Sequence, residues 1–159
     1  MNVLVDVQLA CSNDTIPEAD DIDAWVTRAV MAAGKSRDHE VSVRIVSADE
    51  IQALNREFRD SDRPTNVLSF PTGPIDGLPA GEPVPLGDIV VCAEVVVEEA
   101  KAQGKRPADH WAHMLVHGTL HLMGFDHQEE PQAAEMEGME TEILTEHGLR
   151  DPYKEPAHC

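Results

Sequence analysis

The amino-acid sequence predicts a small mixed β-sheet of four strands covered by five helices. Its 159 residues fit one compact domain, and a hydrophobic content of 42% is enough to form a core. Segments with strand-like alternation are interleaved with segments of helical periodicity, in the order β-α-β-α-β-β-α-α-α. We therefore expect residues 1–159 to form a single domain.

The N-terminal segment predicts a strand followed by a helix. From Asn2 to Leu9, apolar and polar residues alternate, which indicates a strand with one buried face. From Asp20 to Ala33, apolar residues recur at helical spacing, and Gly34 ends the predicted helix. Alternation returns at Val41–Val46, which predicts the second strand.

The second predicted helix begins with a capping signature. The sequence SADE starts at Ser47, and a serine followed three residues later by glutamate is typical of a capping box. We expect this helix to run from about Ala48 to Phe58. The polar segment from Asp60 to Asn66 contains Pro64 and is expected to be a loop.

Two strands separated by a long loop are expected next. Asn66–Phe70 (NVLSF) predicts the third strand, and Gly87–Cys92 predicts the fourth. Between them, Pro71–Pro85 contains five of the eleven prolines and three of the ten glycines. We interpret this segment as a long surface loop, and loops of this length are often functional.

Three helices complete the predicted fold. Ala93–Gln103 is expected to be helical and to end at Gly104. The next helix begins at Pro107 or Ala108 and runs to about Met123. The last, from Glu129 to His147, has an acidic face.

The net charge of −18 restricts the functions that the chain can have. It results from 30 acidic and 12 basic residues, so the protein repels nucleic acid at long range. A nucleic-acid function therefore requires a local exception. Arg56, Arg59 and Arg63 lie within eight positions and are the candidate, although acidic residues are interleaved with them. A solvated helix end and turn is the alternative interpretation.

Cysteine usage and the N-terminus indicate the cellular compartment. The three cysteines are widely spaced and predict no disulfide framework. The N-terminal apolar run lacks a basic region and contains Asp6, so it is a poor signal peptide. No apolar run approaches the roughly 20 residues of a membrane span. We expect a cytoplasmic protein with no membrane partner.

Four histidines lie on one stripe of the predicted helix Ala108–Met123. Their spacings are three, four and four residues, at His110, His113, His117 and His121. The helix is otherwise apolar nearly all round, which is typical of a central, buried helix. Buried imidazoles are costly unless their nitrogen atoms have partners.

The sequence HGTLHLMGFDH predicts a metal site within and just after this helix. His117 and His121 lie one helical turn apart, so both imidazoles can bind one ion. Gly124 can end the helix and reverse the chain, which would bring His127 back toward them. Apart from a missing glutamate, the spacing matches the metzincin motif HExxHxxGxxH. Three protein ligands with one open position are typical of a catalytic metal site.

Several alternatives remain open around this motif. The pair His113 and His117 has the same spacing as His117 and His121 and is a rival metal pair. His113 could also lie behind the ligands or in the pocket, and ordinary packing is the alternative for it and for His110. Gly118 stands where zinc proteases have the glutamate base. Asp126 could accept a proton instead, orient a ligand or cap the turn.

Three segments resemble the YbeY family of bacterial rRNA maturation factors. HMLVHGTLHLMGFDH, from His113 to His127, is similar to the family's first signature, and Leu54–Pro71 is similar to the second. Gly87–Ala100 and the acidic helix ending near DPY also fit. The resemblance extends from about Val41 to Tyr153.

The resemblance implies an α+β fold in which a central helix of a four-stranded sheet carries the metal. It implies a metal-dependent endoribonuclease specific for single-stranded RNA, with roles in 16S rRNA 3′-end maturation and ribosome quality control. The metal ligands would be His117, His121 and His127, and the catalytic residues would be His117 and Arg59. One zinc per chain is expected, with nickel or another divalent metal as alternatives. The expected partners are the 16S rRNA precursor and the ribosome or its small-subunit proteins, and no DNA.

Two other functions compete with this interpretation. The metzincin-like spacing also fits a zinc hydrolase of peptides or small molecules, but Gly118 lacks the carboxylate that such an enzyme needs. A non-catalytic ribosome-assembly factor with a structural metal is the other. A structural zinc site usually has four protein ligands, and only three are evident.

Overall fold

The computed structural model describes every residue except 1, 34–36, 74–76, 80, 126–129 and 154–159. Within the described part of the chain, four strands and five helices follow one another in the predicted order. The strands are β1 (Val3–Leu9), β2 (His39–Val46), β3 (Val67–Pro71) and β4 (Val84–Cys92). The helices are α1 (Ala19–Ala32), α2 (Ala48–Arg59), α3 (Ala93–Ala102), α4 (Pro107–Leu122) and α5 (Glu130–Glu146).

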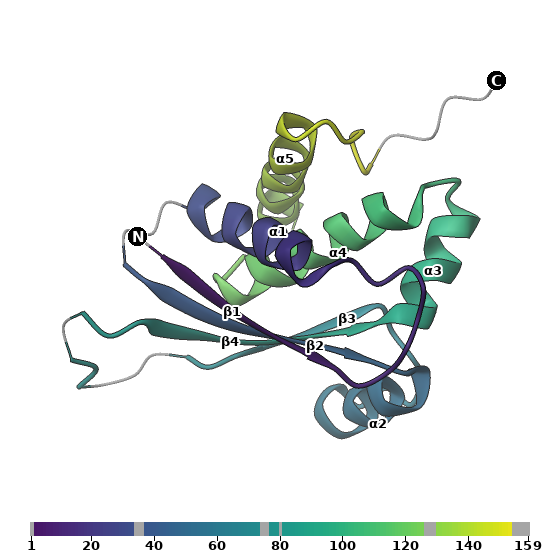
Figure 1. The fold of residues 1–159 in the computed structure, drawn as a ribbon, viewed down its shortest axis with the longest axis horizontal. Helices are drawn as coiled ribbons and strands as arrows, with labels where there is room; N and C mark the ends of the chain where they lie inside the picture. Colours follow the sequence, from purple (N-terminus) through teal and green to yellow (C-terminus); the bar gives the residue numbers. More distant parts are fainter. Residues whose placement is uncertain (1, 34–36, 74–76, 80, 126–129, 154–159) are drawn as a thin grey trace.

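The strands form one mixed sheet in the order β1-β2-β4-β3. β1, β2 and β4 are parallel neighbours, whereas β3 pairs antiparallel with β4 and lies at the edge. α1, α4 and α5 lie on one side of the sheet and α2 on the other (Figure 1). α4 contacts β3, β4 and the helices α1, α3 and α5. The predicted α+β fold with a central histidine-bearing helix is confirmed.

The main core lies between the sheet and the layer of α1 and α4. Alternate residues of β2 and β4, such as Val43 and Ile89, pack there against Trp111 and Leu115 of α4. A second apolar cluster joins α1, α4 and α5. Because α4 is covered on one side by the sheet and on the other by these helices, it is buried nearly all round, as its sequence predicts.

β4 begins earlier than the sequence predicts. The segment from Pro71 to Pro85 was expected to be a loop, but β4 starts at Val84. Pairing with β3 ends at Gly87, so β4 has an open edge at Pro85, where a proline is tolerated. Gly87 has φ +137°, and an added Cβ would lie 2.2 Å from the Phe70 carbonyl oxygen. The close approach of β3 and β4 at this position therefore requires a glycine.

Ser47 caps α2 as the sequence predicts, since its side chain accepts a hydrogen bond from the Glu50 amide, whereas the Glu50 carboxylate binds Arg44. Cys11 and Cys92 are free. Among the described residues, no helix combines the length and the apolar character that a membrane crossing requires.

Candidate functional site

The histidine stripe of α4 runs from the core to a surface cleft. His110 and His113 are buried, whereas His117 and His121 are partly exposed. His110 lies against α3, where its Nε2 atom is 2.9 Å from Oε1 of Glu99. The N-terminal half of the stripe is therefore packed in the core, whereas the C-terminal half reaches the surface.

A buried carboxylate on α5 connects two of these histidines. Glu140 is fully buried, and its Oε1 atom lies 2.5 Å from Nδ1 of His117. Its Oε2 atom lies 3.2 Å from Nε2 of His113 and accepts a hydrogen bond from the Tyr153 hydroxyl. Glu140 shares the buried stripe of α5 with three apolar residues, so its side chain points into the interface with α4.

The charges of this group follow from its hydrogen bonds. Burial raises the pKa of Glu140, but the hydrogen bonds from His113 and His117 outweigh burial and hold this pKa at about 2. Burial lowers the pKa of His113, opposed by its hydrogen bond to Glu140. Burial and the neighbouring carboxylate raise the pKa of Tyr153. At neutral pH, Glu140 is therefore ionised, His113 is neutral and Tyr153 keeps its proton.

The ionised Glu140 determines the tautomer of His117. A carboxylate can only accept hydrogen bonds, so Nδ1 of His117 donates to it and the ring's lone pair lies on Nε2. Histidines that bind metals commonly donate their other ring N–H to a carboxylate in this way. The contact therefore gives His117 the tautomer in which a histidine coordinates a metal through Nε2.

His113, His117 and Glu140 also form a group that can hold a metal ion, since their ligand atoms lie within 4.8 Å of one another. However, two atoms bound to one tetrahedral zinc at about 2.1 Å would lie about 3.4 Å apart. The 2.5 Å between His117 Nδ1 and Glu140 Oε1 is much shorter and fits a hydrogen-bonded pair. The geometry therefore favours Glu140 as the group that orients His117.

A cleft of about 660 Å³ opens beside the partly exposed histidines. The ring centroids of His117 and His121 are 4.7 Å apart, and the two planes are inclined by 78°. The edge strand β3 forms the facing wall, and Arg59 lies at its rim. Among the described residues that line this cleft, none is acidic, although the chain has 30 acidic residues. The described part of the lining is thus a local exception to the negative charge of the protein.

Arg59 is fixed at this rim by the end of α2. The helix ends there because Asp60 adopts a left-handed conformation, with φ 55° and ψ 31°. The Arg59 guanidinium donates to the Ser69 carbonyl at 2.8 Å and lies 5.7 Å from the centre of the Phe70 ring. By contrast, Arg56 is exposed and lies 3.9 Å from Asp62. Of the three clustered arginines, only Arg59 lines the cleft.

Gly118 does not face the cleft. Its backbone packs against the sheet, and an added Cβ would lie 2.9 Å from Ile89 Cγ2 and 3.1 Å from Val67 Cγ2. Its carbonyl oxygen accepts a hydrogen bond from Ser69 Oγ at 2.9 Å. A glutamate at this position would separate α4 from β3 and β4. The packing therefore has no space for the base of a zinc protease on this helix.

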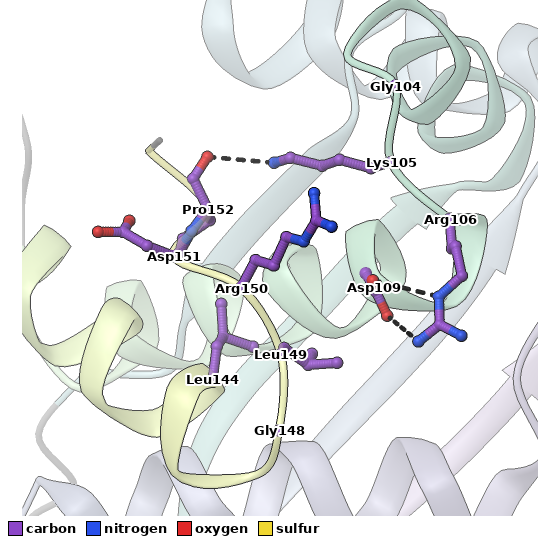
Figure 2. A pocket seen from close by; sticks show the side chains of 10 residues that line it. All are labelled: Gly104, Lys105, Arg106, Asp109, Leu144, Gly148, Leu149, Arg150, Asp151 and Pro152. Carbon is purple, nitrogen blue, oxygen red and sulfur yellow. Dashed lines mark hydrogen bonds and ion pairs between the residues drawn. The ribbon is translucent and has the colours of Figure 1, made fainter. Parts of the chain in front are cut away.

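A separate pocket of about 370 Å³ is lined in part by residues 148–152, which directly precede Tyr153 (Figure 2). Lys105 Nζ donates to the Pro152 carbonyl at 3.2 Å, and burial lowers the pKa of this lysine. The Arg150 side chain extends into the pocket, whereas the Asp151 carboxylate points away from it (Figure 2). Asp151 instead accepts a hydrogen bond from the Tyr153 amide at 2.9 Å. These contacts position Tyr153 beside Glu140.

The structure places two of the three predicted ligands, His117 and His121, at the cleft together with Arg59. His127, the third predicted ligand, and Asp126 lie outside the described residues. The sequence interpretation missed Glu140. The signal for it is a single charged residue within the apolar stripe of α5, where Met136, Ile143 and Leu144 are also buried.

Comparisons with known proteins agree with this architecture. Residues 8–148 match the family Endoribonuclease YbeY. The chain is 55% identical over 139 residues to Endoribonuclease YbeY of Halorhodospira halophila, which covers 87% of this chain and 89% of that protein. It is 50% identical over 150 residues to Endoribonuclease YbeY of Chromohalobacter salexigens, with coverage of 94% and 95%. A solution structure from Thermotoga maritima matches with a TM-score of 0.58 and 26% identity, over 95% of this chain and 99% of that one.

The fold and the site define a small α+β protein whose central helix presents histidines to a cleft with an arginine at its rim. The chain belongs to the YbeY family of endoribonucleases. The predicted resemblance to the YbeY family is confirmed.

Proposed function

We propose that this protein is a metal-dependent endoribonuclease that cuts single-stranded RNA. The main support is the cleft that His117, His121 and Arg59 line together, in a chain that belongs to a family of endoribonucleases. We further propose that His117, His121 and His127 hold one divalent ion per chain. Zinc is the first candidate, and nickel or another divalent metal is the alternative.

The donor set fits such an ion. Imidazole nitrogen is a preferred ligand of zinc, and the hydrogen bond to Glu140 leaves the lone pair of His117 on Nε2. When bound, a divalent ion polarises a phosphoryl oxygen and neutralises part of its charge. Arg59 would bind the same phosphate, and the bond to Ser69 holds its guanidinium at the rim.

The charge of the cleft supports RNA as the substrate. The described lining contains one arginine and no carboxylate, so a phosphate meets attraction there and repulsion over much of the remaining surface. Affinity should decrease with salt, but with a shallow slope, because few cations contact the strand. Duplex RNA should be a poor substrate, since its nucleotides are not free to splay into a cleft.

The proposed cellular role is maturation of the 16S rRNA 3′ end and quality control of ribosomes in the cytoplasm. With a net charge of −18, the protein requires help to bind a large RNA. We propose that the ribosome or its small-subunit proteins supply part of this affinity. DNA is not an expected substrate.

Two alternatives are less well supported. A peptide hydrolase requires a base beside the metal helix, and the contacts of Gly118 with Ile89 and Val67 leave no space for one. A non-catalytic assembly factor with a structural metal would have a closed site, whereas His117 and His121 line an open cleft.

The proposal is tested with zinc-loaded protein and three substrates: an unstructured RNA, a matched RNA duplex and a casein-like peptide. We expect cleavage of the unstructured RNA, slow cleavage of the duplex and an intact peptide. A His117→Ala variant should be inactive, and Glu142→Gln, which changes an exposed residue of α5, should retain activity. Proteolysis with inert RNA would overturn the proposal in favour of a metallohydrolase.

A further inference from the structure

A second groove lies on the face of the sheet that carries α2. Its volume is about 520 Å³, within the range of small-molecule sites. Leu54 and Phe58 of α2 and Phe70 of β3 form its apolar wall. Polar residues of β1, β2 and β4 form its floor. The lining residues are Gln8, Ser42, Arg44, Glu50, Leu54, Phe58, Phe70, Asp88 and Val90.

Phe58 is the unusual member of this wall. It is 56% exposed, although the chain has only three phenylalanines. Its ring meets Phe70 edge to face, with centroids 5.4 Å apart and planes inclined by 71°. This contact supports the Phe58 ring on one side. An exposed and supported aromatic ring is the element on which unpaired nucleic-acid bases stack.

Two contacts at the edge strand β3 relate the groove to the cleft. Phe70 lines the groove, and the Arg59 guanidinium, which lines the cleft, lies over the Phe70 ring at 5.7 Å. Phe58 directly precedes Arg59 at the end of α2. Phe58 and Arg59 both contact the Phe70 ring, so an aromatic ring and a guanidinium meet at this end of α2.

The charges of the groove fit a base better than a phosphate. Its one cation, Arg44, is neutralised by Glu50, with contacts of 2.6 Å and 3.0 Å. Asp88 is exposed and adds a further carboxylate. A phosphate would be repelled here, whereas a base offers an apolar face to Phe58 and N–H groups to a carboxylate.

We propose that this groove is a base-binding subsite in which Phe58 stacks on an unpaired base of the RNA whose phosphate Arg59 holds. The proposal rests on the proposed endoribonuclease function and extends it to the substrate's bases. It gives a physical reason for preferring single strands, because a paired and stacked base cannot turn onto the Phe58 ring.

The test compares Phe58→Ala, Phe58→Leu and Phe58→Tyr in titrations of a fluorescent single-stranded RNA, with gels to show that the RNA stays intact. Because Phe58→Ala removes the ring on which the base stacks, it should weaken RNA affinity roughly 5- to 150-fold. Phe58→Tyr should bind like the wild type and Phe58→Leu should be intermediate. Met31→Ala, which truncates a residue of α1 that is 53% exposed, is the matched control and should have no effect.

Abasic nucleotides distinguish stacking from a general loss of affinity. One abasic site is moved along the RNA, which removes a base and leaves every phosphate in place. At one position, the abasic site should weaken RNA binding by the wild type as much as Phe58→Ala does. In the Phe58→Ala variant, the same abasic site should cause no further loss of affinity. Additive effects at every position would overturn the proposal, as would an unchanged affinity of Phe58→Ala.

The outcomes also separate this proposal from the endoribonuclease function. If wild-type protein cleaves the RNA and Phe58→Ala binds it equally well, the function stands and the subsite is wrong. A concentration-dependent change in sedimentation of the wild type that is lost in Phe58→Ala would then assign the groove to a second copy of the chain. If the wild type neither binds nor cleaves RNA, both proposals fail.

Discussion

Replacing Glu140 with glutamine tests the buried centre of the site. The carboxylate accepts hydrogen bonds from Nδ1 of His117, Nε2 of His113 and the Tyr153 hydroxyl, and it is fully buried. Glutamine has nearly the same shape as glutamate, but one of the two carboxylate oxygens is replaced by an NH₂ group. This NH₂ group is a donor and would face the donors that the lost oxygen accepted from. At least one of the three hydrogen bonds must therefore be lost.

The magnitude follows from the charge of the acceptor. A hydrogen bond to a charged group contributes about 1.5–3 kcal/mol, so we expect the Glu140→Gln variant to be about 2–3 kcal/mol less stable. For a domain of this size, that corresponds to a decrease in Tm of roughly 5–10 °C. Loss of a carboxylate that orients a metal-binding histidine typically lowers metal affinity by about 10- to 100-fold.

Thermal unfolding and competition titrations with a zinc chelator measure the two effects separately. Glu142→Gln removes one exposed charge from the same helix and should change stability by less than about 0.5 kcal/mol. A Glu140→Gln variant with unchanged Tm would refute the hydrogen-bonded network. A lowered Tm with unchanged zinc affinity would refute the orienting role and leave Glu140 as a structural residue alone.

Three further predictions concern the neighbouring residues. Elemental analysis of His121→Ala should show strongly reduced metal. His113→Ala changes a buried residue outside the proposed ligand set and should retain more metal. The reverse order would favour the group of His113, His117 and Glu140 as the metal site. Arg59→Ala should keep its fold and its metal, since an exposed arginine contributes less than about 0.5 kcal/mol to the stability of the fold. The variant should lose RNA cleavage. An unchanged cleavage rate would make Arg59 a structural charge. The hydrogen bond from His110 lowers the pKa of Glu99 below its usual 4.5. The ionised carboxylate therefore stabilises the fold above about pH 4.5. This contribution is lost as the pH falls through the lowered pKa. Urea unfolding at several pH values should therefore show a steeper acid loss for wild type than for Glu99→Gln, and parallel curves would contradict this.

Local patterns predicted most of the fold because each one specifies its own element. Alternation predicts β1 and β2, the capping box predicts the start of α2, and the apolar surface of α4 predicts its central position. β4 was predicted too short because Gly87 and Pro85 lie where β3 ends, and the sequence does not show which edge is unpaired. Glu140 was missed for a related reason. Its role depends on the packing of α5 against α4, which local periodicity does not reveal.

The position of Gly118 was informative in a way that the motif alone could not be. Comparison with zinc proteases treats the glycine as a missing base. In the structure it is a contact residue, because Ile89 and Val67 would lie within 3.1 Å of an added Cβ. The missing carboxylate therefore follows from how α4 packs on the sheet.

The acid–base properties of the remaining described residues around His117 also indicate that none of these residues acts as a general base. A carboxylate whose pKa is about 2 is a weak base at neutral pH, and Glu140 already accepts three hydrogen bonds. Tyr153 keeps its proton because burial raises its pKa, and His113 is buried and neutral. These groups hold protons in place and orient His117, and none is poised to accept a proton from a nucleophile. A site of this kind suits the proposed reaction, which depends on positioning a phosphate and neutralising its charge, because the guanidinium of Arg59 lines the same cleft as His117 and His121.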